Sequence, residues 1–165
     1  MIQANTNWED RKTVKKGNIG EEITRQYLES KGYIIYKPLT EGAHSFDNLA
    51  IKGKTNIFIV EVKTKPRRKY YNDTGIDIRH YKTYREVSKK HNLKVFIFFI
   101  DEIQGLVYGN DLNNLIKPVD NKKQYPLVDK GIVYFHLSNM IEIAKLTQEQ
   151  VENIKAYSTS NYTYS

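Results

Sequence analysis

Apolar positions fall in short runs along the chain, and the spacing within each run predicts the element it forms. The run Ile57–Thr64 is nearly continuous in β-branched and aromatic residues, which predicts a strand buried on both faces in the middle of a sheet. Lys94–Asp101 is a second strongly apolar strand, and Gly105–Tyr108 is expected to pair with it. Apolar residues at helical spacing predict an amphipathic helix from Gly17 or Asn18 to about Ser30.

The first helix carries signals at both ends. Asn18 is expected to cap it, with Glu21 and Glu22 in the first turn, where the helix dipole favours negative charge. Gly32 is expected to end it in a left-handed conformation. Glu21 lies at the margin of the buried arc, and Glu22 is expected to face water. The arc itself is predicted to centre on Ile19, Ile23 and Tyr27.

The rest of the pattern completes one domain. It predicts strands at Tyr33–Lys37, Phe46–Lys52 and Ile132–His136, a second helix at Asp77–His91, and helical pieces at Asp111–Ile116, Asn139–Lys145 and Gln148–Tyr157. Pro66–Gly75 is expected to be a loop, and the short Lys52–Asn56 connection indicates a hairpin. We expect a flexible arm at residues 1–16, a single domain at 17–155 (core 17–101, extension 102–155) and a frayed tail at 156–165.

Charge and composition narrow the classes of partner. The 165 residues carry 26 Lys and Arg against 19 Asp and Glu, a net charge of +7, which favours a polyanion: nucleic acid, or alternatively an anionic membrane. With no cysteine, the chain has no disulfide and no cysteine-based zinc site. The N-terminus lacks the apolar stretch of a signal peptide, and Val95–Ile100 is too short to span a bilayer, so a cytoplasmic location is expected.

Two acids and a lysine stand out at the ends of the predicted strands. Glu61 and Lys63 are two residues apart, so both side chains point to one face of a core strand, where they are costly to bury without partners. Asp47 begins the neighbouring strand in an apolar setting, and Glu21 could reach the same region. Carboxylates brought together repel one another unless a hard cation binds, and Mg²⁺ suits two carboxylates and a backbone carbonyl. The simpler alternative is a salt bridge at the edge of the core.

Such a cluster suits the hydrolysis of phosphodiesters, because a metal-bound water loses its proton readily and a nearby lysine can orient or deprotonate it. Other chemistries lack their motifs: there is no glycine-rich nucleotide-binding loop and no close histidine pair for a zinc hydrolase.

Three short motifs in this order resemble the PD-(D/E)XK nuclease superfamily, in particular archaeal-type Holliday junction resolvases and related small phage and bacterial endonucleases. They are Gly17-Asn18-Ile19-Gly20-Glu21, Phe46-Asp47 and Glu61-Val62-Lys63, with Phe46 in the place of the nominal proline. The resemblance covers residues 17–101. It implies an α/β, restriction-endonuclease-like core of order α-β-β-β-α-β, with a central mixed sheet flanked by helices and a C-terminal extension of strands and helices.

Carried onto this sequence, the resemblance assigns a role to each acid. Asp47 and Glu61 would be ligands of Mg²⁺ (or of Mn²⁺), together with the backbone carbonyl of Val62. Lys63 would position or activate the attacking water, and Glu21 would complete the catalytic cluster. A residue of the second helix would also line the site, with His80, Tyr81 and Tyr84 as candidates.

The loop after the central strand interleaves basic and aromatic residues, which can grip phosphates and stack on bases, or can equally be a solvated loop. The residues expected to contact nucleic acid are Lys65, Arg67, Arg68, Lys69, Tyr70 and Tyr81. We therefore expect a Mg²⁺-dependent DNA endonuclease acting on branched DNA, working as a homodimer without a nucleotide cofactor or membrane. The alternatives are a restriction or repair nuclease, a non-catalytic nucleic-acid-binding module on the same fold, and an interaction or inhibitor protein.

Overall fold

A six-stranded mixed sheet forms the centre of the molecule. The computed structural model describes residues 11–39, 46–120 and 124–158. The sheet has the order β1-β2-β3-β5-β6-β9, in which β3 and β5 are parallel and the other neighbours antiparallel. Its strands are β1 (Ile34–Tyr36), β2 (Asn48–Lys52), β3 (Asn56–Thr64), β5 (Lys94–Asp101), β6 (Leu106–Asp111) and β9 (Ile141–Lys145). A smaller antiparallel sheet has the order β4 (Asp73–Asp77), β8 (Ile132–His136), β7 (Leu127–Asp129).

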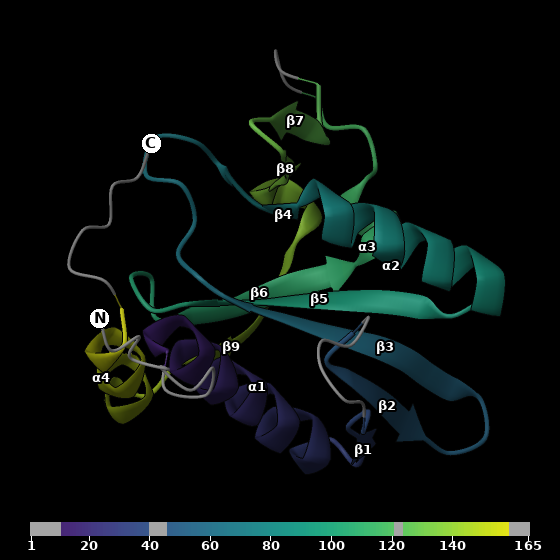
Figure 1. Ribbon diagram of the computed structural model, residues 1–165, viewed down its shortest axis with the longest axis horizontal. Helices are drawn as coiled ribbons and strands as arrows, with labels where there is room; N and C mark the ends of the chain where they lie inside the picture. Colours follow the sequence, from purple (N-terminus) through teal and green to yellow (C-terminus); the bar gives the residue numbers. More distant parts are fainter. Residues whose placement is uncertain (1–10, 40–45, 121–123, 159–165) are drawn as a thin grey trace, which may run out of the picture.

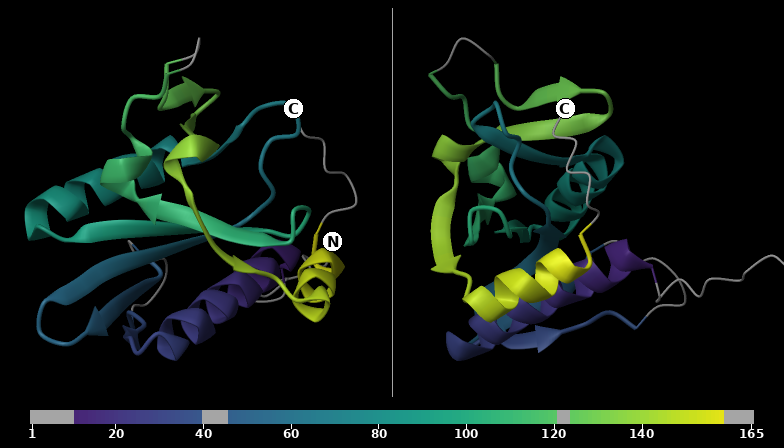
Figure 2. Two further views of the ribbon diagram at one scale, coloured as in Figure 1. Left: turned by 180° about the vertical axis from the view of Figure 1, so that it is seen from behind. Right: turned by 90° about the vertical axis from the view of Figure 1, so that its left-hand side faces the viewer.

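Helices cover both faces of the large sheet. α1 (Lys12–Ser30) and α4 (Gln148–Ala156) lie on one face, and α2 (Ile78–His91), α3 (Leu112–Leu115) and the small sheet lie on the other (Figures 1 and 2). A short 3₁₀ turn, η2 (Leu137–Asn139), leads from β8 to β9. The chain is therefore α/β with a central mixed sheet flanked by helices, as the sequence predicts. Among the described residues, no helix is both long and apolar enough to cross a membrane.

β3 is the strand that the sequence places in the middle of a sheet, and this prediction is confirmed. Its side chains alternate between two separate apolar cores: Ile59 packs on the α2 side, whereas Val60 and Val62 pack on the α1 side. Because side chains alternate along a strand, Glu61 and Lys63 share the α2 side with Ile59. A core strand thus ends in an ion-paired face next to α2.

α1 begins earlier than predicted. It starts at Lys12, and the side chain of the N-cap residue, Arg11, does not cap the helix end. Asn18 is therefore not the cap, and Glu21 is not in the first turn. The residues from Lys12 to Lys16 are therefore helical, and residues 1–10 of the expected arm lie outside the described residues. The buried stripe is Gly20, Thr24 and Leu28, with Ile19, Ile23 and Tyr27 half-buried beside it. Glu22 is exposed as predicted and pairs with Arg25.

Gly20 is where α1 comes closest to the sheet. A Cβ at this position would overlap the Oγ1 atom of Thr64, at the end of β3. Glycine therefore lets the helix backbone approach the strand more closely than any other residue would. This contact fixes the height of α1 over the end of β3, and it places Glu21, the next residue, near the same strand end.

Three segments differ from the predicted elements. Residues 73–75, expected in a loop, begin β4, where Gly75 has no room for a Cβ against the backbone of Val133 on β8. Asn139–Lys145, expected to be helical, instead contains the last residue of η2 and the strand β9. As a strand, β9 pairs with the backbone of β6, and two of its residues, Ile143 and Ala144, pack in the core. β7 had no predicted counterpart. The remaining predicted strands and helices are present, although β1 is shorter and β2 begins at Asn48, two residues after Phe46.

Candidate active site

Glu61 is a buried carboxylate with one oxygen unsatisfied. It is 3% exposed, and its Oε1 atom accepts from Lys63 Nζ at 2.7 Å. Its Oε2 atom has no hydrogen-bond partner among the described residues. A buried, unpaired carboxylate oxygen costs free energy unless a cation or donor binds to it. Glu61 therefore keeps one buried carboxylate oxygen for which the described residues supply no donor.

Asp47, the residue directly before β2, reaches the same place. Antiparallel pairing of β2 with β3 ends at Asn48 and Val60, and beyond it the Val62 N–H donates to Asp47 Oδ2 at 2.7 Å. The N–H and C=O groups of one strand residue point to the same edge, so the Val62 carbonyl also faces the edge where Asp47 lies. Two carboxylates and one backbone carbonyl thus lie near one another where β2 leaves β3.

The pKa of Asp47 reports how close these charges are. Burial raises the pKa of this carboxyl to about 7, and the negative charges of Glu61 and then Glu21 add to the increase. The Val62 N–H and the Lys63 ammonium act in the opposite direction. Burial and the neighbouring negative charges therefore disfavour the ionised form of Asp47.

Glu21 contributes charge to the cluster from the other side of the sheet. Its carboxylate lies 3.6 Å from the ammonium of Lys37 and is 25% exposed. In the part of the chain that the structure describes, no group of three or more His, Cys, Asp or Glu side chains is placed to hold a metal ion. The catalytic role assigned to Glu21 by resemblance stays a prediction.

The donors present fit a hard, octahedral cation. Asp47, Glu61 and the Val62 carbonyl supply oxygen atoms, and the orphaned Oε2 of Glu61 is one of them. Mg²⁺ binds through one or two carboxylates and keeps several of its waters, so it does not need a third protein carboxylate. Because there is no thiolate and no histidine pair among these donors, the set does not suit a structural zinc ion.

α2 lines the site with His80 and Tyr84 and not with Tyr81. His80 Nδ1 is 3.3 Å from Lys63 Nζ. Burial and then the charge of Glu61 raise the pKa of the Tyr84 hydroxyl. Tyr81 lies on the flank of the helix that faces the small sheet, with its ring 6.2 Å from that of Phe135. Sequence spacing alone could not decide which of the three candidates on this helix face the site, because that depends on how α2 is rotated over β3.

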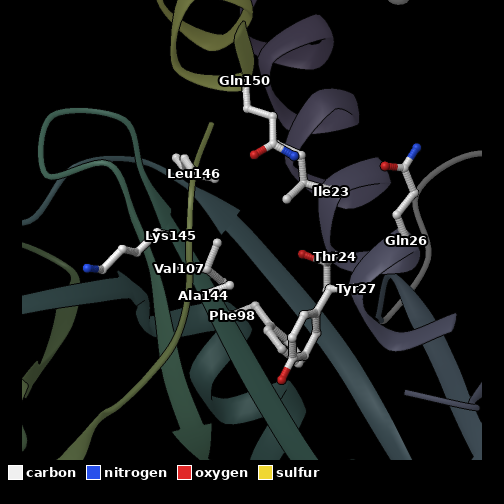
Figure 3. Close-up of a pocket in the computed structure, with 10 residues that line it drawn as sticks. All are labelled: Ile23, Thr24, Gln26, Tyr27, Phe98, Val107, Ala144, Lys145, Leu146 and Gln150. Atoms are coloured by element: carbon white, nitrogen blue, oxygen red, sulfur yellow. The ribbon is translucent and has the colours of Figure 1, made fainter. Parts of the chain in front are cut away.

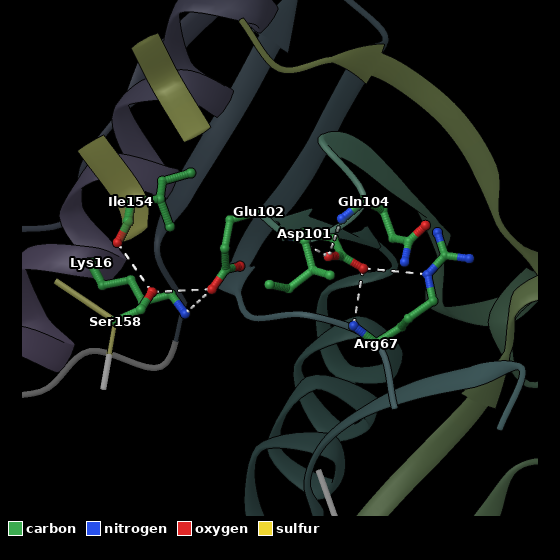
Figure 4. A network of polar contacts seen from close by, with 8 residues as sticks. Lys16, Arg67, Asp101, Glu102, Gln104, Ile154 and Ser158 are labelled. Atoms are coloured by element: carbon green, nitrogen blue, oxygen red, sulfur yellow. Dashed lines mark hydrogen bonds and ion pairs between the residues drawn. The ribbon is translucent and has the colours of Figure 1, made fainter. Parts of the chain in front are cut away.

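Arg67 is held by a buried carboxylate. Its backbone N–H donates to Asp101 Oδ2 at 3.0 Å and its Nε to the same oxygen at 3.3 Å. Asp101 is fully buried at the end of β5 and also accepts the backbone N–H of Gln104 (Figure 4). In the same view, the ammonium of Lys16 pairs with the buried Glu102. The Arg67 side chain thus pins the loop to the sheet.

Arg68 is bound in the same manner. Its guanidinium makes two hydrogen bonds to the fully buried Asp73, with Nε to Oδ1 at 2.6 Å, and lies between the rings of Tyr71 and Tyr134 at 4.0 and 3.7 Å. Tyr125 also donates to Asp73 at 2.7 Å. Both arginines are paired with buried acids of the protein itself. These contacts differ from the two expectations for this loop, which were phosphate binding and free solvation.

The other residues predicted to bind nucleic acid divide by exposure. Lys69 and Tyr70 are exposed, Tyr70 by 75%, at the turn before β4. Lys65 is half-buried and donates to the Gly75 carbonyl at 2.6 Å, and burial together with the charge of Lys63 lowers its pKa to about 8. Lys69 and Tyr70 are therefore placed to meet a ligand in solution, whereas Lys65 ties β3 to β4.

A cavity of about 260 Å³ lies on the opposite side of the large sheet. It lies between α1, α4 and β9, and apolar side chains such as Ile23, Tyr27 and Leu146 line it (Figure 3). No residue of the predicted site lines this cavity. The candidate site is thus at the strand ends on the α2 side, away from this cavity.

Comparison with known proteins identifies the fold. No protein-family model matches the chain, and no curated protein matches it in sequence. Among solved structures, Hjc, a Holliday junction resolvase from the archaeal hyperthermophile Archaeoglobus fulgidus, superposes with a TM-score of 0.52 over 78% of this chain and 97% of its own, at 12% identity. Similarity at this identity shows the fold alone. The predicted restriction-endonuclease-like fold, and with it the resemblance to archaeal resolvases, is confirmed.

Proposed function

We propose that this protein is a metal-dependent DNA endonuclease that hydrolyses phosphodiester bonds in branched DNA. The observation that carries the proposal is the buried Glu61 carboxylate, which has an unsatisfied oxygen and lies close to Asp47 at the end of β3. The basic chain, with a net charge of +7, supports an anionic substrate.

Each residue of the site has a part in the proposed reaction. Asp47, Glu61 and the Val62 carbonyl would hold Mg²⁺, or Mn²⁺ in its place. When bound, the metal would acidify a water and offset charge on the phosphoryl group. Lys63, whose ammonium lies 2.7 Å from Glu61, would orient the attacking water and stabilise the negative charge that develops. Glu21 would add negative charge that favours cation binding.

The proposal of a branched substrate and a dimer rests on two arguments. The fold is shared with a Holliday junction resolvase. A symmetric junction presents two equivalent strands, and a protein with one site per chain cuts both most simply as a twofold dimer. The exposed Lys69 and Tyr70 are the loop residues that we propose to contact the DNA.

A cleavage assay tests the function. Purified protein is offered a four-way junction, linear duplex, single-stranded DNA and RNA, each with Mg²⁺, Mn²⁺ or EDTA. We expect metal-dependent cutting of the junction in preference to the linear duplex, and loss of cutting in Asp47→Ala and Lys63→Ala. Cutting of another substrate would correct the substrate class. Clear DNA binding without cutting of any substrate would replace the nuclease with a non-catalytic binding module.

A further inference from the structure

Lys63 is held from two elements at once. Its Nζ atom lies 2.7 Å from Glu61 Oε1 on its own strand and 3.3 Å from His80 Nδ1 on α2. We propose that His80 is a positioning residue, which fixes the Lys63 ammonium through a hydrogen bond accepted by Nδ1. The inference rests on the proposed function, because it explains how the catalytic lysine of that site is kept in place.

The contact defines the tautomer of His80. An ammonium only donates hydrogen bonds, so the Nδ1 atom facing it must be unprotonated and the ring proton must lie on Nε2. Burial and then the charge of Lys63 lower the pKa of the His80 imidazole, which favours this neutral form, although Glu61 and Asp77 oppose the shift. A neutral imidazole with a lone pair on Nδ1 is the state that the geometry requires.

Two features of α2 support the exposed His80 side chain. His80 lies in the first turn of α2, whose N-cap Asp77 accepts a hydrogen bond from the backbone N–H of Arg79 at 2.8 Å. One turn further along, the buried Tyr84 ring packs against the imidazole, with centroids 6.0 Å apart. Residues four apart share a helical face, so Tyr84 supports His80 on the side toward the core.

A bound metal would weaken the ion pair that holds Lys63, and His80 would then keep the ammonium in place. A cation that takes the oxygen atoms of Glu61 competes with the lysine for the same carboxylate. If Glu61 were its only partner, the released lysine side chain would sample many rotamers. The rate of a reaction falls steeply when a catalytic group is displaced. His80 gives Lys63 a second partner that is not a metal ligand, so the ammonium stays near the water that it must orient.

Nitrogen NMR of the histidine rings tests the contact without any catalysis. We expect His80 to show the Nε2–H tautomer, with an Nδ1 resonance shifted by hydrogen bonding. In Lys63→Met, that resonance should move to the position of a free acceptor. The proposal is overturned if the ring proton of His80 lies on Nδ1, or if its Nδ1 resonance does not respond to Lys63→Met.

Single-turnover cleavage tests the consequence. His80→Ala should lower the maximal rate about 10-fold or more with an unchanged Kd for DNA. His80→Asn, whose Oδ1 atom can take the place of Nδ1, should recover most of that loss, whereas His80→Gln, whose amide reaches the Nε2 position, should not. His91→Ala, at the exposed end of the same helix, is the matched control and should cut at the parent rate.

Three outcomes of that assay are decisive. An unchanged rate in His80→Ala, or equal losses in the Ala and Asn variants, would overturn the positioning role while the nuclease stands. A wild-type protein that cuts nothing would overturn the proposed function, and the NMR result would still decide whether His80 holds Lys63.

Discussion

Asp47 lies between two opposing demands. Its backbone partner Val62 favours the charged carboxylate, whereas burial and the nearby Glu61 favour the neutral acid, and the second effect is larger. A raised carboxyl pKa means that the folded protein binds a proton more tightly than the unfolded chain. The stability associated with that proton is therefore full below about pH 4 and is lost as the pH rises through 7.

Asp47→Asn should therefore stabilise the metal-free protein, and more so at high pH. The amide keeps an oxygen for the Val62 N–H but cannot ionise. We expect the free energy of unfolding to rise by about 1–3 kcal/mol at pH 8, with little gain at pH 4–5, measured by urea denaturation with EDTA. Mg²⁺ should raise the Tm of the wild type and not of the variant. An equal effect of the substitution at both pH values would show that Asp47 is not raised in pKa.

The buried ion pair of Arg68 in the loop can also be tested through stability. Replacing it with alanine leaves the fully buried Asp73 without its bidentate partner, so Arg68→Ala should lower the free energy of unfolding by about 2–4 kcal/mol. Adding Asp73→Asn should recover part of the loss. Lys69→Ala, at the exposed neighbouring position, should change stability by less than about 0.5 kcal/mol.

The same pair of variants separates two roles for the loop. If Lys69 contacts a phosphate, Lys69→Ala should reduce the salt slope of DNA binding by about 1. A stable Arg68→Ala variant that binds DNA weakly would contradict the structural role of Arg68 and restore it as a phosphate ligand.

At the scale of elements, the site depends on how closely α1 approaches β3. Gly20→Ala would place a methyl group against Thr64 Oγ1 and should destabilise the fold by about 1–3 kcal/mol, as overpacking does. Gly17→Ala, in the same helix with open space around it, should instead stabilise by about 0.5–1 kcal/mol. Adding Thr64→Ala to Gly20→Ala should remove the clash and recover part of the lost stability. Equal effects of the two glycine substitutions in thermal unfolding would contradict the close approach.

Much of this core could be predicted because its signals are local. The apolar run of β3 is central in the sheet, and the parity of Glu61 and Lys63 places them on one face. Asp47 meets them because a short hairpin leaves little freedom to the pairing of β2 and β3.

What escaped prediction depends on contacts that are distant in sequence. β4 and β7 form only because β8, some 55 residues after β4, supplies their partner. Arg67 and Arg68 read as a basic loop because the acids that bind them, Asp101 and Asp73, belong to other strands. Whether His80 or Tyr81 faces the site depends on the rotation of α2 about its axis relative to β3, and a helical wheel does not give that rotation.

At the scale of the whole molecule, the proposed cutting of a branched substrate calls for a dimer, in which each chain would contribute one site. We expect sedimentation equilibrium to give twice the 19.4 kDa chain mass, and cutting of the two junction strands to be coupled. A protein that remains a monomer while bound to a junction would contradict the proposed dimer without affecting the site in each chain.

The most direct measurement of the proposed chemistry is the single-turnover rate of junction cleavage in Mg²⁺ for the wild type and Asp47→Asn, with Asp129→Asn, an exposed acid of β7, as the control. A metal-dependent wild-type rate that falls at least 100-fold in Asp47→Asn and is unchanged in Asp129→Asn is the predicted result. Equal rates in the wild type and Asp47→Asn would contradict the assignment of the site, and no cleavage by any of the three would contradict the nuclease itself.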